Sequence, residues 1–110
     1  MLNPNISEIV IDGFRRTGKS FKACVKAVDL TLMGNVVIIV CRNSVTADRN
    51  RKTVLSIISS LPQDSVKYNK GKVMFGDSVI YFLSLNGYNE RVKDYYFAGI
   101  PSVIAILDLD

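Results

Sequence analysis

The sequence contains no histidine and only two cysteines, Cys24 and Cys41. The cysteines do not form a Cys-x-x-Cys spacing, and without histidine they cannot complete the usual four-ligand set of a zinc site. We therefore expect two reduced thiols with structural roles, and neither a zinc site nor a redox centre.

Long apolar runs are also missing. Runs such as VVIIV at 36–40 and VIAIL at 103–107 are far shorter than the roughly 20 residues of a membrane-spanning helix, and they predict buried strands. The opening segment, MLNPNISE, lacks the basic start and apolar core of a signal peptide, so we expect a cytosolic protein, in the host cytoplasm if the source is viral. The length of 110 residues, without linker or repeat, predicts a single domain over 1–110.

Charge of one sign is in modest excess, because 14 basic residues against 10 acidic ones give a net charge of +4. This balance is compatible with an anionic partner but does not require one. The densest basic segment, DRNRK at 48–52, predicts either a solvated helix face, which we favour, or a nucleic-acid contact.

The first half of the chain alternates between strand and helix patterns. β-Branched residues predict strands over 8–13 and 35–42. Apolar residues at helical spacing predict a helix from Lys19 to about Met33 and a second helix that is capped by Thr46 and ends before Pro62. The expected buried positions are Phe21, Cys24, Val25, Val28 and Leu32 in the first helix, and Val54, Leu55, Ile57, Ile58 and Leu61 in the second. This order is typical of a parallel sheet with right-handed crossovers.

The second half begins differently. Short extended segments over 66–86, with Gly-Asp between two apolar runs, predict two or three antiparallel strands. A polar stretch with a helical turn is expected over 87–99, and a buried strand that carries Asp108 and Asp110 follows Pro101. The aromatic residues at 94–97 close the edge of a core, which we favour, or stack on bases.

The segment IDGFRRTGKSF at 11–21 has the spacing G-x-x-x-x-G-K-[ST] through Gly13, Gly18, Lys19 and Ser20. Glycines let consecutive backbone N–H groups approach phosphate oxygens, and the following helix adds its unpaired N–H groups and positive end. Lysine supplies a mobile charge for the terminal phosphates, and the serine hydroxyl is a hard ligand for Mg²⁺. A strand before the segment and a helix after it are the context that this motif needs.

Asp108 ends an apolar strand, so it is expected at the carboxyl edge of the sheet, where ligands of α/β folds bind. There it would support the metal ion that Ser20 also holds. The alternative is a solvated terminal acid.

Together, GFRRTGKS and VIAILD resemble the Walker A and Walker B motifs of P-loop NTPases. More narrowly, residues 8–110 are similar to the amino-terminal ATPase part of phage terminase large subunits, and through them to helicase-like ATPases. Three features carry this similarity: Arg15 three places before the second glycine, the strand VVIIVCRNS followed directly by a helix, and the hairpin-like segment VKYNKGKVMFGDSVIYFLSL. The resemblance implies an α/β fold with a three-layer P-loop NTPase-like sheet, mainly parallel, with an antiparallel hairpin insertion.

The resemblance also implies residue roles. Arg15 would compensate charge on the transferring phosphoryl group, as an arginine finger supplied in cis, with Arg16 as the alternative. ATP would be held by Gly13, Arg16, Thr17, Gly18, Lys19 and Ser20, Mg²⁺ by Ser20 and Asp108, and catalysis would involve Arg15, Asp108 and Asp110.

Two departures from the family pattern bear on turnover and topology. Leu109 occupies the place of the family's catalytic glutamate, while Asp110 points the same way as Asp108 along an extended strand. The family also places a later strand between the Walker A and Walker B strands. We therefore expect a different strand order, a partner that supplies the strand, or a piece of a longer motor.

The leading functional interpretation is an ATP-binding domain of terminase or helicase type, with Mg²⁺-dependent hydrolysis linked to phage DNA packaging. Partners would then be the nucleotide, double-stranded DNA, and further copies of the chain or a phage protein. The alternative is a non-catalytic relative that binds nucleotide or protein as an interaction or regulatory protein. A small P-loop kinase is disfavoured, because no lid or acceptor-binding arginine set is visible.

Overall fold

The computed structural model describes residues 6–11, 18–62, 65–69, 71–93, 97, 99–100 and 102–109. Within these residues strands and helices follow the expected alternation. The elements are β1 (Ile6–Val10), α1 (Lys19–Leu32), β2 (Val36–Cys41), α2 (Ser44–Ile57), β3 (Val66–Tyr68), β4 (Lys72–Phe75), β5 (Ser78–Ser84), α3 (Leu85–Lys93) and β6 (Val103–Asp108).

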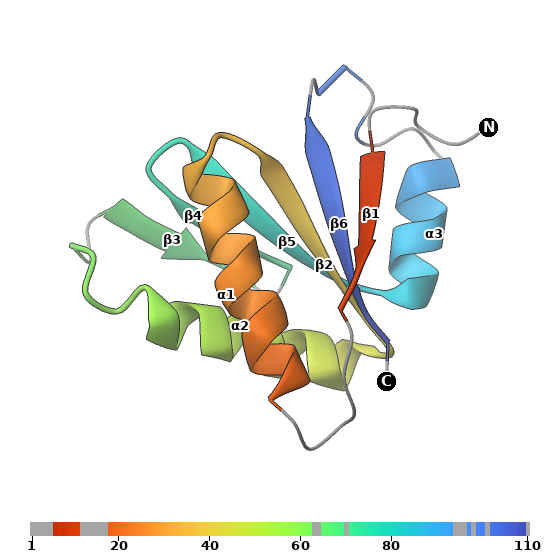
Figure 1. Ribbon diagram of the computed structural model, residues 1–110, viewed down its shortest axis with the longest axis horizontal. Coiled ribbons are helices and arrows are strands. Elements are labelled where there is room, and N and C mark those ends of the chain that lie inside the picture. Colours follow the sequence, from red (N-terminus) through yellow and green to blue (C-terminus); the bar gives the residue numbers. More distant parts are fainter. Residues whose placement is uncertain are drawn as a thin grey trace.

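One mixed sheet contains all the described strands, in the order β1-β6-β2-β5-β4-β3 (Figure 1). The first four strands in this order are parallel, whereas β4 is antiparallel to both β5 and β3. The mainly parallel sheet and the antiparallel segment over 66–86 are thus confirmed. Interior strand β2 carries the continuous β-branched run, and Val37 to Cys41 are fully buried there, as expected for a strand covered on both faces.

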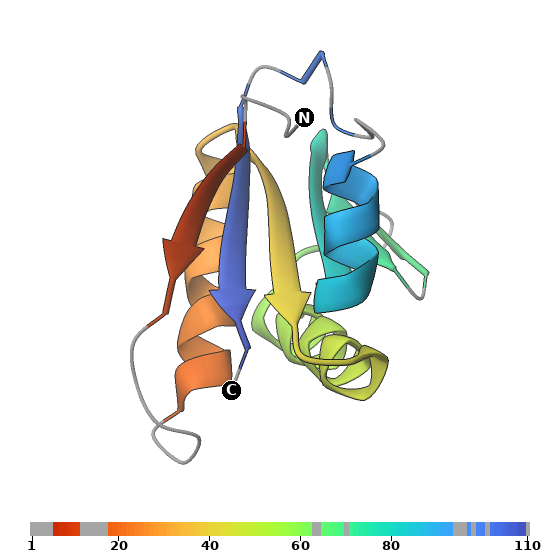
Figure 2. The ribbon, with the colours of Figure 1, turned by 90° about the vertical axis from the view of Figure 1, so that its right-hand side faces the viewer.

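The helices cover the sheet from two sides. Side chains of α1 and α2 form one core cluster with one face of the strands, and Tyr88 of α3 belongs to a second cluster on the other face. Figure 2 shows α1 and α3 on opposite sides of the strands. Tyr88 also donates a hydrogen bond of 2.7 Å from its Oη to Oε2 of Glu8, which ties α3 to β1. Among the described helices, none has the combined length and apolarity required to span a bilayer.

The buried face of α1 differs from the predicted one. Cys24 and Val28 are buried as expected, but Phe21 is 56% exposed and Leu32 is 66% exposed. The remaining buried apolar positions are Ala23 and Ala27, which have no exposed surface. Small side chains let the helix axis approach the sheet closely, so the helix is rotated toward its alanines and away from its largest residues.

The amino-terminal cap of α2 is Asn43, not Thr46. The Asn43 side chain accepts a hydrogen bond of 2.9 Å from the backbone N–H of Thr46. Thr46 in turn accepts one of 3.3 Å at its Oγ1 from the backbone N–H of Asn43. This reciprocal pair is a capping box, so Thr46 contributes to the cap from the third helical position.

The β1 strand ends earlier than predicted, at Val10, and it pairs directly with β6 from Ile6–Val103 to Val10–Leu107. The strand that the resemblance placed between them is therefore not between them here, so the strand order differs from the family pattern at this point of the sheet. Because β1 and β6 form a continuous parallel ladder, their facing backbone groups pair with each other.

The structure also describes most of the polar stretch that follows β5 and one residue of the aromatic segment after it. The polar stretch forms a helix, α3, which begins at Leu85 and therefore two residues earlier than predicted. Phe97 has no exposed surface and contacts the ring of Tyr81 edge-on, with centroids 5.3 Å apart. The core interpretation of this aromatic residue is confirmed; residues 94–96 lie outside the described residues.

The capping box predicts a measurable cost for Asn43→Ala. Loss of the side-chain acceptor leaves a helix N–H group without its partner and should lower the free energy of unfolding by about 1 kcal/mol. Urea unfolding monitored by circular dichroism measures this change. Asn43→Asp keeps the acceptor and should retain most of the stability; equal losses in both variants would contradict the capping role.

Candidate phosphate-binding site

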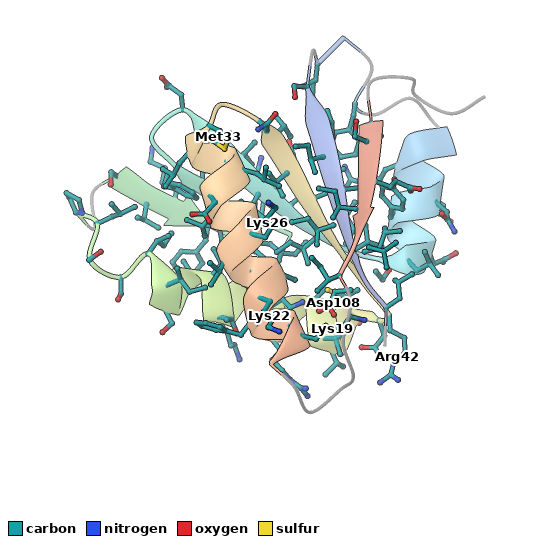
Figure 3. The ribbon with its side chains drawn as sticks, viewed as in Figure 1. Lys19, Lys22, Lys26, Met33, Arg42 and Asp108 are labelled. Atoms are coloured by element: carbon teal, nitrogen blue, oxygen red, sulfur yellow. The ribbon has the colours of Figure 1, made fainter. Side chains whose placement is uncertain are left out.

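The amino terminus of α1 lies at the carboxyl edge of the sheet (Figure 3). Gly18 precedes the helix with φ of 74°, in the left-handed region, and no atom of the described residues lies within 4 Å of the place a Cβ would occupy. Glycine is therefore favoured here by backbone conformation rather than by lack of space. Lys19 and Ser20 follow as the first two helical residues, as predicted.

Asp108 is the last residue of β6, between the ends of β1 and β2, and it pairs with Cys41 across the β2–β6 ladder. Its side chain is at the same edge as Lys19, and the two labels lie together in Figure 3. The sequence-based expectation that this carboxylate lies at the carboxyl edge of the sheet is thus confirmed. The alternative of a solvated acid is wrong, because Asp108 is only 4% exposed.

Three groups surround the Asp108 carboxylate. Its Oδ2 accepts a hydrogen bond of 2.8 Å from Oγ of Ser20 and one of 3.1 Å from Nδ2 of Asn50. The Nζ of Lys19 lies 3.9 Å from Oδ1, and Lys19 itself is 6% exposed. A buried carboxylate needs such compensation, since desolvation of an unpaired charge costs several kcal/mol.

The second carboxylate oxygen, Oδ1, is buried and has no hydrogen-bond partner among the described residues. Such an oxygen fits a cation ligand, because buried polar atoms otherwise have partners. Ser20 fits as well: its hydroxyl donates to Asp108, so both oxygen lone pairs remain for a metal ion. No cluster of three or more histidine, cysteine or acidic side chains exists in the described ranges.

Asn50 is the residue that sequence reasoning missed. It is 2% exposed and donates from Nδ2 to Oδ2 of Asp108 and to Sγ of Cys41, both at 3.1 Å. Its backbone oxygen accepts a contact of 3.6 Å from Sγ of Cys24. The available signal was its spacing, since Asn50 lies three residues after Ala47 and four before Val54 on the buried face of α2.

The basic segment around Asn50 is largely paired within its own helix. Asp48 accepts from Arg51 at 2.8 Å and lies 3.4 Å from Nζ of Lys52. The hydrogen bond from Arg51 is the main reason that the pKa of Asp48 is lowered. These contacts fit the solvated helix face that we favoured over a nucleic-acid contact.

Both cysteines lie beneath this site as buried thiols. Burial is the main cause that raises the pKa of Cys24 to about 12 and that of Cys41 to about 11. The negative charge of Asp108 raises both values further, whereas the hydrogen bond from Asn50 lowers that of Cys41. The thiols are therefore protonated at neutral pH, in agreement with the structural role expected from the sequence.

The other predicted site residues are Gly13, Arg15, Arg16, Thr17 and Asp110, and they lie outside the described residues. Leu109, at the place of the family's glutamate, is half-buried and packs against the second core cluster. Arg42 was not predicted; it is exposed, directly follows β2, and lies at the same edge of the sheet as Asp108 (Figure 3).

Comparison of the chain with protein-family models, curated proteins and solved structures found no match. The similarity to terminases therefore stays a prediction, and function has to be argued from the site itself.

Replacement of Asn50 should destabilise the protein. Asn50→Ala removes a donor from a buried carboxylate and should lower the free energy of unfolding by about 2 kcal/mol, the scale of hydrogen bonds to charged groups. Urea unfolding measures the loss. Thr53→Ala changes a partly buried residue of the same helix whose hydroxyl makes an exposed hydrogen bond. It is the control and should cost far less; similar costs would contradict the role given to Asn50.

Asn50→Asp adds a pH test. The carboxylate of Asp108 would raise the pKa of the introduced carboxyl group in the folded state. Because this pKa is higher in the folded than in the unfolded state, the variant should lose free energy of unfolding at neutral pH, where the group is ionised in the unfolded state. This loss should disappear as pH falls toward about 4, where the carboxyl group becomes protonated in the unfolded state as well. A penalty that does not change between these values would show that the two side chains do not interact.

The raised thiol pKa values predict strong protection from alkylation. At about pH 8 an ordinary exposed thiol is partly ionised and reacts. The thiols of Cys24 and Cys41 in the folded protein should react only at the rate at which local or global unfolding exposes them. Iodoacetamide labelling followed by mass spectrometry, with and without urea, measures the difference. Fast labelling of either cysteine without urea would contradict this description.

Proposed function

We propose that this chain is an ATP-binding domain of P-loop type, similar to the ATPase part of terminases and helicases. The observation that carries the proposal is the hydrogen bond of 2.8 Å between Ser20 and Asp108, beside an oxygen of the same carboxylate that has no hydrogen-bond partner among the described residues. It brings the serine of one motif against the aspartate of the other, 88 residues away in the chain.

Each described residue has a chemical task in this proposal. Gly18 and the first turn of α1 would offer backbone N–H groups to the phosphates. Lys19 would transfer its interaction from Asp108 to the terminal phosphates, since its ammonium group is held at the site and its stem is flexible. Ser20 and Asp108 would hold Mg²⁺, which neutralises phosphate charge when bound.

Hydrolysis of ATP is a separate claim from ATP binding in this proposal. Coupling to DNA packaging would require a group that orients the attacking water, and Asp110 and Arg15 are the predicted participants. A non-catalytic nucleotide-binding or protein-binding relative is the second candidate. Leu109, which is half-buried against the second core cluster, favours it, because an apolar side chain cannot polarise water.

Lys19→Ala tests nucleotide binding. Charge-assisted hydrogen bonds contribute about 1.5–3 kcal/mol each, so loss of the ammonium group should weaken ATP binding in the presence of Mg²⁺ by about tenfold or more. Isothermal titration calorimetry measures the affinity. Lys26→Ala removes the same charge from an exposed position on the same helix and should bind as the wild type does. Unchanged affinity in a folded Lys19→Ala protein would overturn the proposal.

A phosphate-release assay separates the two candidates. Turnover that is lost in both Lys19→Ala and Asp108→Asn would establish the ATPase. ATP binding without turnover above background would favour the non-catalytic relative. Absence of both ATP binding and turnover would reject both nucleotide roles.

A further inference from the structure

Asn50 is a polar residue on the buried face of a helix, where apolar side chains are usual. Ala47 and Val54, its neighbours at helical spacing, are buried apolar residues of the core cluster beneath α1 and α2. Asn50 itself is only 2% exposed. A buried amide costs free energy unless hydrogen bonds replace those it makes to water. Its contacts therefore indicate what an asparagine contributes at this position.

The NH₂ group of Asn50 uses both of its hydrogen atoms within the protein. Its Nδ2 donates to Oδ2 of Asp108 and to Sγ of Cys41, each at 3.1 Å. An amide nitrogen carries one hydrogen atom for each of these bonds and none beyond them. The two acceptors belong to neighbouring strands and are paired across the β2–β6 ladder. The amide is therefore held at two points at the carboxyl edge of the sheet.

The hydrogen bonds to Asp108 are distributed unequally between its two oxygens. Oδ2 accepts from Nδ2 of Asn50 and, at 2.8 Å, from Oγ of Ser20. A carboxylate has about four lone-pair sites, half of them on each oxygen, so Oδ2 is fully used. Oδ1 is buried and has no hydrogen bond among the described residues, although Nζ of Lys19 lies 3.9 Å away. The capacity of this carboxylate to bind a further group is therefore concentrated on Oδ1.

Divalent cations differ in how they use a carboxylate. Ca²⁺ takes about six to eight oxygen ligands, and a carboxylate binds it through one oxygen or through both. Mg²⁺ demands near-ideal octahedral geometry and combines a small number of carboxylates with water and phosphate oxygens. A carboxylate with one saturated oxygen offers a single ligand atom. It suits Mg²⁺ and withholds the two-oxygen mode that is open to Ca²⁺.

We infer that Asn50 is a positioning residue that selects Mg²⁺ over Ca²⁺ at the proposed ATP site. Its hydrogen bond fills Oδ2, so Asp108 binds the metal ion through Oδ1 alone. Residues that hydrogen-bond a metal ligand in this way orient the ligand, and their loss typically costs about 10- to 100-fold in metal affinity or activity. The inference rests on the proposed function, because the metal ion is the one that accompanies ATP.

The first test compares two cations in the wild-type protein. Isothermal titration calorimetry measures ATP affinity with saturating Mg²⁺, with saturating Ca²⁺ and with EDTA. The gain from each cation is the ratio of the affinity with that cation to the affinity with EDTA. The Mg²⁺ gain should exceed the Ca²⁺ gain by about tenfold, the lower end of the effect expected for such a residue. This comparison needs no variant, and equal gains from the two cations would overturn the inference.

The second test removes the amide. Asn50→Leu nearly preserves the side-chain volume but leaves Oδ2 with one hydrogen bond fewer, so this oxygen becomes able to bind the metal ion. The Mg²⁺ gain should fall by about tenfold, whereas the Ca²⁺ gain should stay within about twofold of the wild type. A purely structural role would lower the affinity in all three conditions together and would leave the ratio of the two gains unchanged.

The matched control disturbs the same helix face without touching the carboxylate. Val54 has no exposed surface and lies four residues after Asn50 on the buried face of α2. Val54→Ala therefore loosens the packing there and removes no hydrogen bond to Asp108. It should lower the free energy of unfolding but retain the wild-type ratio of the Mg²⁺ and Ca²⁺ gains.

The outcomes separate this inference from the proposed function. A folded wild-type protein that binds no ATP in any of the three conditions would reject the ATP site, and the inference with it. If ATP binds, a ratio of gains that Asn50→Leu leaves unchanged, or that Val54→Ala lowers as much, would overturn the role of Asn50 and leave the ATP site in place. A preference for Mg²⁺ that is lost only in Asn50→Leu would support both.

Discussion

The carboxylate of Asp108 joins three elements that are far apart in the sequence. Ser20 contacts it from the first turn of α1, Asn50 from the middle of α2, and its own backbone extends β6 between β1 and β2. Few domains of this size place an acidic side chain in such a position without strong compensation, because a buried charge without partners opposes folding. The positions of both helices on their shared sheet face are therefore constrained by one side chain.

The same carboxylate connects stability to chemistry. One oxygen is satisfied by the two hydrogen bonds, while the other faces the ammonium group of Lys19 at 3.9 Å without a hydrogen bond among the described residues. An arrangement chosen for stability alone would pair both oxygens. The incomplete pairing is what we expect where a cation and phosphate groups complete the set, and the buried thiols beneath Asn50 keep this region apolar and inert.

Part of this arrangement could be predicted from the sequence, and the reason is local. Gly18, Lys19 and Ser20 belong to one short motif, and Asp108 ends an apolar strand, so their common edge follows from the topology of parallel strands. Asn50 was missed because the composition of DRNRK does not mark it. Its spacing of three and four residues from Ala47 and Val54 places it on the buried face of α2, but its contact with Asp108 appears only once α2 is packed against the sheet. The rotation of α1 toward Ala23 and Ala27 also depends on tertiary packing. The close approach of the helix to the sheet through these alanines prevailed over burial of the large Phe21 side chain. The direct pairing of β1 with β6 is set by tertiary structure, whereas the family resemblance predicted another strand between them.

The measurement that tests the central claim most directly is the Mg²⁺ dependence of ATP affinity in the wild type and in Asp108→Asn, by calorimetry with Mg²⁺ or with EDTA. If Asp108 and Ser20 hold the metal ion beside the phosphates, Mg²⁺ should increase the affinity of the wild type, and most of that increase should vanish in Asp108→Asn. An equal increase in both proteins, or wild-type affinity that does not respond to Mg²⁺, would contradict the assignment of this carboxylate to the metal site.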